Sequence, residues 1–220
     1  MKREKKKKVM EIWLALSNLI FLVDSYIAFV YARYTRAFIY LAIVFASGSY
    51  HLCKSYVNAC LFDYTVQRNI DFFFAEFVIP LTAFYLMDFG RLAFLETWLI
   101  LLTAVVLALI QISGHAGMMV HGAIAVTSAS LLIGYWALTC CRRVRYNFLY
   151  LFIGIFLTAL GVILFTIQET WMDAYWALHS LWHVLVGLGQ YFIIITKPPA
   201  KRWQNLATRL PVVMSRSYVQ

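Results

Sequence analysis

The chain has 220 residues, of which 63% are hydrophobic and 13% are charged, and its mean hydropathy is +0.74. These values exclude a water-soluble globular domain and indicate a polytopic membrane protein. The net charge of +9 is accounted for by membrane topology and by attraction to anionic lipid headgroups, so no nucleic acid is expected as a partner.

Seven continuous apolar segments follow one another along the chain. We expect them to span the membrane at residues 9–31, 37–57, 70–88, 92–112, 117–139, 147–167 and 174–196, between a basic N-terminal tail, 1–8, and a basic C-terminal tail, 197–220. Continuous rather than alternating runs of about 20 residues predict helices and not the strands of a barrel. Because the loops are short, neighbouring helices should be antiparallel in one all-α, seven-transmembrane-helix bundle, similar in outline to a G-protein-coupled receptor.

The distribution of Lys and Arg predicts the orientation of the bundle. The C-terminal side carries Arg33, Arg36, Arg91, Arg142, Arg143, Arg145, Lys197, Lys201, Arg202, Arg209 and Arg216, whereas the opposite side carries Lys54, Arg68 and six residues of the N-terminal tail. Cytoplasmic loops are enriched in these residues. We therefore expect a cytoplasmic C-terminus and an extracellular N-terminus. The expected location is the plasma membrane, with the Golgi or endoplasmic reticulum as alternatives.

Five polar residues are predicted to lie in one layer of the membrane. Ser47 and His51 are four residues apart in the second span, Asp71 opens the third, and His179 and His183 are four residues apart in the seventh. Residues four apart share one face of a helix. Counting from the loops places all five toward the side of the N-terminus, and polar residues at this depth are candidates for function.

Three imidazoles with a carboxylate and a hydroxyl at one depth are typical of a zinc site. His51, His179 and His183 would be the ligands, a water would take the fourth position, and Asp71 and Ser47 would hold the water or the rings by hydrogen bonds. For the pair in the seventh span alone, the alternative is that each ring hydrogen-bonds across the bundle.

The four cysteines form two pairs in the sequence. Cys53 and Cys60 lie near the predicted external end of the second span, where they form either a disulfide or two free thiols. Cys140 and Cys141 precede a basic loop at the predicted cytoplasmic end of the fifth span. They are candidates for palmitoylation, with buried free thiols as the alternative.

Other polar and aromatic residues of the spans allow two interpretations. Asp24 and Glu76 either pair with neighbouring helices, the interpretation that we favour, or take part in catalysis. A group of aromatic residues surrounds the histidine pair and either cradles an acyl chain or belongs to the aromatic belt of the membrane interface: Trp171, Tyr175, Trp176 and Trp182.

The stretches "RAFIYLAIVFASGSYHLC", "DFFFAEF" and "DAYWALHSLWHVLVGLGQYFII" resemble the CREST superfamily, which groups alkaline ceramidases, progestin and adipoQ receptors and the myomaker-related proteins. The resemblance covers about residues 30–196 and is closest to the myomaker-related branch. It implies a zinc ion bound by the three histidines with Ser47 and Asp71 around it, a phospholipid bound in the bundle, and a homodimer.

The resemblance leaves two functions open. In the first, the chain promotes cell–cell fusion of myoblasts, with a zinc ion that is structural and a second fusion protein as a possible partner; this is the function that the resemblance favours, and it is not enzymatic. In the second, it is a zinc-dependent lipid amidase or esterase, with Asp71 as general base and Ser47 steadying the developing oxyanion. A hormone receptor of seven helices is less well supported.

Overall fold

In the computed structural model of the chain, the described residues are 2–56, 60–87, 89, 93–114, 118–139, 146–168, 170–171 and 174–198. These residues form helices and contain no strand, so the prediction of an all-α membrane bundle is confirmed. The helices are α1 (Lys2–Ser17), α2 (Ile20–Val30), α3 (Tyr34–Ser55), α4 (Tyr64–Met87), α5 (Ala93–Ile112), α6 (Met118–Thr139), α7 (Phe148–Ile167) and α8 (Tyr175–Ile195).

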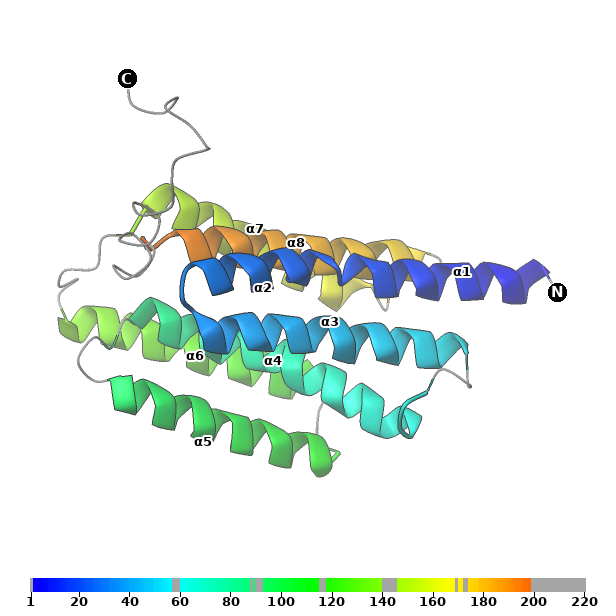
Figure 1. Ribbon diagram of the computed structural model, residues 1–220, viewed down its shortest axis with the longest axis horizontal. Helices are drawn as coiled ribbons and strands as arrows, with labels where there is room; N and C mark the ends of the chain where they lie inside the picture. Colours follow the sequence, from blue (N-terminus) through cyan, green and yellow to red (C-terminus); the bar gives the residue numbers. More distant parts are fainter. Residues whose placement is uncertain are drawn as a thin grey trace, which may run out of the picture.

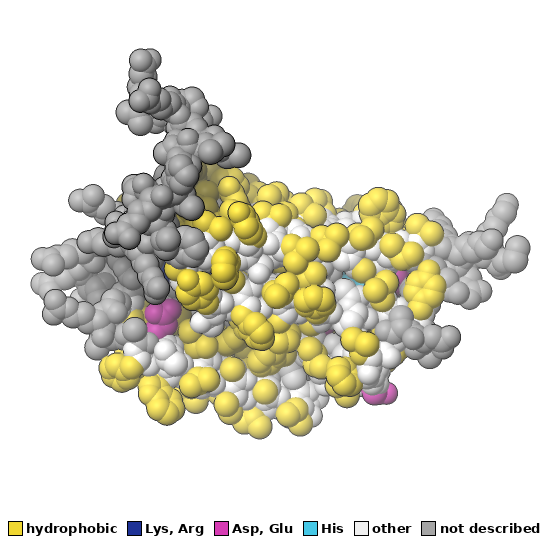
Figure 2. Space-filling view, in the orientation of Figure 1, with side chains coloured by type: hydrophobic (Ala, Val, Ile, Leu, Met, Phe, Trp, Pro, Cys, Tyr) yellow, Lys and Arg dark blue, Asp and Glu magenta, His cyan; other side chains and the backbone are white. Residues whose placement is uncertain are grey.

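The described helices follow the order of the predicted spans, with two helices in the first span. Six segments are long and apolar enough to cross a membrane, and α6 contributes a shorter apolar stretch, Gly122–Leu138. The first of the six, Val9–Val30, runs through both α1 and α2. Large apolar side chains such as Phe45, Leu109 and Phe152 are each more than 60% exposed, and apolar side chains cover the face shown in Figure 2. Such a surface is suited to contact with lipid.

The first predicted span, 9–31, is wrong as a single helix, because the chain forms two helices there. The carbonyl of Leu14 accepts hydrogen bonds from Ser17 Oγ (2.7 Å) and Asn18 Nδ2 (3.1 Å). Short polar side chains that bind a nearby carbonyl compete with the helical hydrogen bond of the backbone. α1 therefore ends at Ser17 and α2 starts at Ile20, although the two helices continue along one line (Figure 1).

The helix predicted over 70–88 begins earlier than expected, at Tyr64. Asp63 starts it: its Oδ1 accepts the backbone N–H of Thr65 at 2.8 Å, and its carbonyl accepts that of Gln67 at 3.0 Å. This is the role of a helix N-cap. Asp71 therefore lies about two turns inside α4 and does not open the helix.

Contacts between helices place α1 between two partners that are distant in sequence. α1 packs against α3 and α8, α2 packs against the same two helices, and α4 joins α3 to α5 and α6. Figure 1 shows α1 and α2 running alongside α3 and α8. Side chains from the first, third and eighth helices can therefore meet inside the bundle.

Glycines bring α7 and α8 close together. A Cβ atom at Gly154 would lie 2.8 Å from the carbonyl oxygen of Gly189, and a Cβ at Gly189 would lie 2.3 Å from Thr158 Oγ1. Small residues let the backbones of membrane helices approach closely. The position of α8, which carries two of the candidate ligands, depends on this contact.

Candidate metal centre

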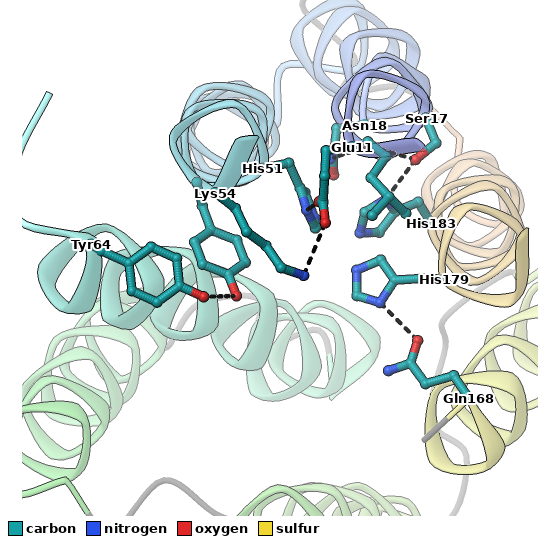
Figure 3. Close-up of polar contacts among 11 residues, drawn as sticks. Glu11, Ser17, Asn18, His51, Lys54, Tyr64, Gln168, His179 and His183 are labelled. Carbon is teal, nitrogen blue, oxygen red and sulfur yellow. Dashed lines mark hydrogen bonds and ion pairs between the residues drawn. The ribbon is translucent and has the colours of Figure 1, made fainter. Parts of the chain in front are cut away.

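Three histidine rings meet inside the bundle. His51 comes from the last third of α3, and His179 and His183 come from the first half of α8. Their side chains are 0%, 6% and 2% exposed, and one ring nitrogen from each lies within 4.8 Å of the other two. Figure 3 shows the rings pointing toward a common centre. The predicted convergence of these residues from two distant spans is confirmed.

Each ring is held at Nδ1 by a side chain from another helix or its end. His51 Nδ1 lies 3.3 Å from Glu11 Oε2, His179 Nδ1 lies 2.7 Å from Gln168 Oε1, and His183 Nδ1 lies 2.7 Å from Ser17 Oγ. The carboxylate and amide oxygens are acceptors, so the rings of His51 and His179 donate to them.

The hydroxyl of Ser17 sets the tautomer of the third ring, that of His183. Its single proton is donated to the carbonyl of Leu14, so it accepts the N–H of His183 Nδ1. All three rings then carry their proton on Nδ1 and present a lone pair at Nε2. A hydrogen bond at one ring nitrogen is what sets the tautomer of a metal-bound histidine.

The donor set fits a metal ion. His51 Nε2 is buried and has no hydrogen-bond partner among the described residues, and one ring nitrogen of each histidine lies within 4.8 Å of the other two. A cation shared by the three nitrogens would satisfy them. Zinc binds imidazole nitrogen at about 2.0–2.1 Å, which puts tetrahedral ligand atoms about 3.3 Å apart. The rings would close by a small movement to reach that spacing.

Glu11 and Lys54 form an ion pair beside the site that sequence reasoning missed. Lys54 Nζ lies 3.1 Å from Glu11 Oε1, while the other oxygen of Glu11 faces His51 (Figure 3). Glu11 is 5% exposed although it lies in an apolar segment. A buried acid within a membrane span is the signal that identifies it.

Ser17 and Gln168 were also missed by sequence reasoning. Glu11 and Asn18 are seven residues apart and both are almost fully buried, so they mark a polar face of the first span toward which Ser17 lies. Gln168 follows α7 directly, and its position at the end of an apolar helix gives no sign of the ring that it contacts.

Ser47 and Asp71 lie next to this centre and are buried. The Asp71 carboxylate of α4 lies close enough to the hydroxyl of Ser47 and to His51 to interact with both. A carboxylate and a hydroxyl from two helices therefore lie near each other beside the ring of His51.

The four aromatic residues proposed for lipid binding differ in position. Tyr175 and Trp182 contact the ring of His179, with centroids 5.2 and 4.9 Å away. Trp176 is partly buried. Trp171 is 66% exposed and so faces outward.

Cys53 and Cys60 form a disulfide that joins the end of α3 to the segment before α4. This bond holds the end of the helix that carries His51. Cys140 and Cys141, the palmitoylation candidates, lie outside the described residues.

The pairing predicted for Glu76 is confirmed, because Gln111 Nε2 of α5 donates to its Oε1 at 3.0 Å. Asp24 is fully buried and interacts electrostatically with Arg36 of α3, although neither carboxylate oxygen has a hydrogen-bond partner among the described residues.

The fold and the three rings define the chain as a multi-pass, all-α membrane protein with a buried candidate metal centre between α3 and α8. Residues 7–184 match the family described as "Protein of unknown function (DUF3522)", and the chain belongs to this family.

Two relatives are similar to this chain over most of its length. The chain is 27% identical over 203 residues to human "Post-GPI attachment to proteins factor 6", which covers 86% of this chain and 26% of the human protein. It is 28% identical over 192 residues to mouse "Transmembrane protein 8B", which covers 82% of this chain and 40% of the mouse protein. The chain thus spans less than half the length of these relatives.

Proposed function

We propose that this chain is a zinc-dependent lipid hydrolase of the CREST type that acts within the membrane. The observation that carries the proposal is the convergence of three buried imidazoles beside Asp71, whose carboxylate interacts with Ser47 and His51. Ligand residues alone would suit a structural metal. A buried carboxylate and hydroxyl beside them are the groups that hydrolysis of an ester or amide requires.

The residues of the centre would have different roles in the hydrolysis. His51, His179 and His183 would hold the zinc ion, which supplies a Lewis acid for the carbonyl of an ester or amide. Asp71 accepts the proton of the attacking water and later delivers it to the leaving group. Ser47 donates a hydrogen bond that orients the Asp71 carboxylate, and the same hydroxyl can turn to the developing oxyanion.

The depth of the site supports a membrane lipid as substrate. All three rings lie within helices that are candidate membrane spans, and Tyr175 and Trp182 add aromatic surface beside His179. The printed name of the human relative refers to proteins after the attachment of GPI, which supports a lipid ester or a lipid-linked substrate here.

The test compares the wild type with Asp71→Asn after purification and reconstitution into vesicles that contain phospholipid, ceramide or a GPI-linked peptide. We expect the wild type to release fatty acid and Asp71→Asn to lose activity by about 10²-fold or more, with zinc content unchanged in both. Glu76→Gln, a buried carboxylate of the same helix, is the matched control. Equal turnover by the wild type and Asp71→Asn would contradict the proposal, as would a wild type that contains zinc and turns over none of these lipids.

A second candidate is the myomaker-like function, promotion of myoblast fusion at the plasma membrane by a lipid-binding homodimer. It is favoured by the tight enclosure of the rings, each nearly fully buried and held at Nδ1, because structural zinc sites are closed. Expression in fusion-defective myoblasts tests it. Rescue by both the wild type and Asp71→Asn, without lipid turnover, would support fusion over hydrolysis. Expression in cells that do not normally fuse would show whether a second fusion protein is needed.

A further inference from the structure

The end of α3 opposite His51 carries a second buried polar cluster. Arg36 lies in the first turn of α3 and Arg33 directly precedes the helix. Fifteen residues of helix separate Arg36 from His51, which corresponds to about 22 Å along the axis. The cluster is therefore separate from the candidate metal centre, and it lies at the end of the bundle where α2 turns into α3 and α8 ends (Figure 1).

Arg36 is buried without enough acceptors. It is 4% exposed, and its Nη2 donates to Thr82 Oγ1 at 2.8 Å. Its Nε and Nη1, together with Nε of Arg33, are buried and have no hydrogen-bond partner among the described residues. A buried guanidinium that lacks acceptors is strongly unfavourable, because the desolvation of the charge is not compensated.

Three cationic side chains lie against the aromatic ring of Tyr85. The guanidinium carbons of Arg36 and Arg33 lie 4.4 and 5.2 Å from its centroid, and Lys197 Nζ lies at 4.5 Å. Lys197 follows the end of α8 and donates to the carbonyl of Tyr85, so its position is explained by a helix C-terminus and a backbone acceptor. The two arginines have no such explanation.

Their place at the start of α3 makes the arginines more unusual. The N-terminus of a helix has a partial positive charge and unsatisfied N–H groups, so it favours anions and disfavours cations. α3 is 22 residues long and has no side-chain cap at Arg33. Two arginines there become favourable when an anion is bound, because guanidinium forks and helical N–H groups both bind phosphate oxygens.

One described carboxylate faces the cluster. Asp24 of α2 interacts electrostatically with Arg36, but neither of its oxygens forms a hydrogen bond with the described residues. It therefore does not satisfy the free nitrogens of Arg36.

We propose that Arg33, Arg36 and the first turn of α3 form a binding site for a phosphate group, at the opposite end of the bundle from the histidines. Arg36 is the third residue of the candidate span Tyr34–Lys54, which places it at the membrane interface where lipid phosphates lie. The chemistry is that of a phosphate ester, supplied by a phospholipid headgroup or by a free phosphate.

The experiment uses the full chain in dodecyl maltoside, a detergent without phosphate. Dioctanoyl phosphatidic acid and inorganic phosphate are titrated separately, and the rise in melting temperature reports binding. A rise with phosphatidic acid alone identifies a lipid headgroup, whereas a rise with both identifies free phosphate as a sufficient ligand. A wild type whose melting temperature changes with neither ligand overturns the proposal.

Single substitutions test how much each residue contributes to phosphate binding. We expect Arg36→Gln to weaken binding about tenfold or more, and Arg33→Gln, whose side chain is only half-buried, to give a smaller loss in a chain that folds. Asp24→Asn, which leaves both arginines in place, should bind at least as tightly as the wild type. Arg68→Gln, an exposed arginine of α4, is the control and should bind as the wild type does. Unchanged affinity in both Arg36→Gln and Arg33→Gln overturns the assignment.

Discussion

The two ends of α3 carry buried polar clusters with opposite hydrogen-bonding properties. Near its C-terminal end, His51 and its two neighbours have their donors satisfied by Glu11, Gln168 and Ser17 and keep their lone pairs for one centre. At its start, the arginines keep donors that no described residue satisfies. A site with spare lone pairs is suited to a cation and one with spare donors to an anion. Counting unsatisfied donors and acceptors therefore predicts the charge of each ligand.

Removal of two histidines at one end of α3 should abolish metal binding there and leave the other end intact. In the His179→Ala/His183→Ala variant we expect bound zinc, measured by elemental analysis of the purified protein, to fall to background, because a single remaining imidazole does not retain the ion. Phosphate binding at the other end should be unchanged.

The matched control replaces the other two histidines of the chain, His115 and His121, with alanine and should retain its zinc. Full metal content in the variant of the α8 pair would show that these residues are not ligands.

Substitution of a glycine should weaken both ends together. Gly189→Ala places a Cβ atom 2.3 Å from Thr158 Oγ1 and 2.9 Å from a backbone oxygen of α7, so α8 must move away. Overpacking of this kind costs about 1–3 kcal/mol, and we expect a lower melting temperature together with weaker binding of both ligands. Gly134→Ala, where the added Cβ meets nothing within 4 Å, should melt within a degree or two of the wild type. Equal melting temperatures of the two variants would contradict the described packing.

The side chains of Glu11 and Lys54, which lie beside the rings, should have a smaller effect on metal affinity than the rings themselves. Glu11→Gln removes the charge that faces His51 and leaves Lys54 without its ion-pair partner. Partners that hold a metal-bound histidine contribute about 10–100-fold in metal affinity, and competition with a chelator of known affinity should show a loss of this size. Lys54→Gln, which removes the ion pair but keeps the contact with His51, should lose less. If Lys54→Gln lost as much zinc affinity as Glu11→Gln, the charge pair and not the contact with the ring would be the important feature.

Several parts of the fold and of the site follow from local patterns. Runs of about 20 apolar residues identify the spans because lipid requires backbone groups to be satisfied within each helix. The i, i+4 spacing of His179 and His183 places both on one face, and the order of the loops places His51 at the same depth. The break in the first span was missed because it depends on side chains that bind one carbonyl, that of Leu14, and hydropathy does not report such bonds. The early start of α4 was missed because a capped polar turn has the composition of a loop.

Local sequence patterns predict the class of protein, the order of its spans and the three candidate ligands, because hydrophobic length and helical periodicity are properties of neighbouring residues. The packing of the helices places α1 between α3 and α8, so that Glu11 and Ser17 hold two of the rings, and it buries Arg36 with unused donors. These features depend on which helices pack together. That choice is made by shape, as at Gly154 and Gly189, and not by the composition of any one segment.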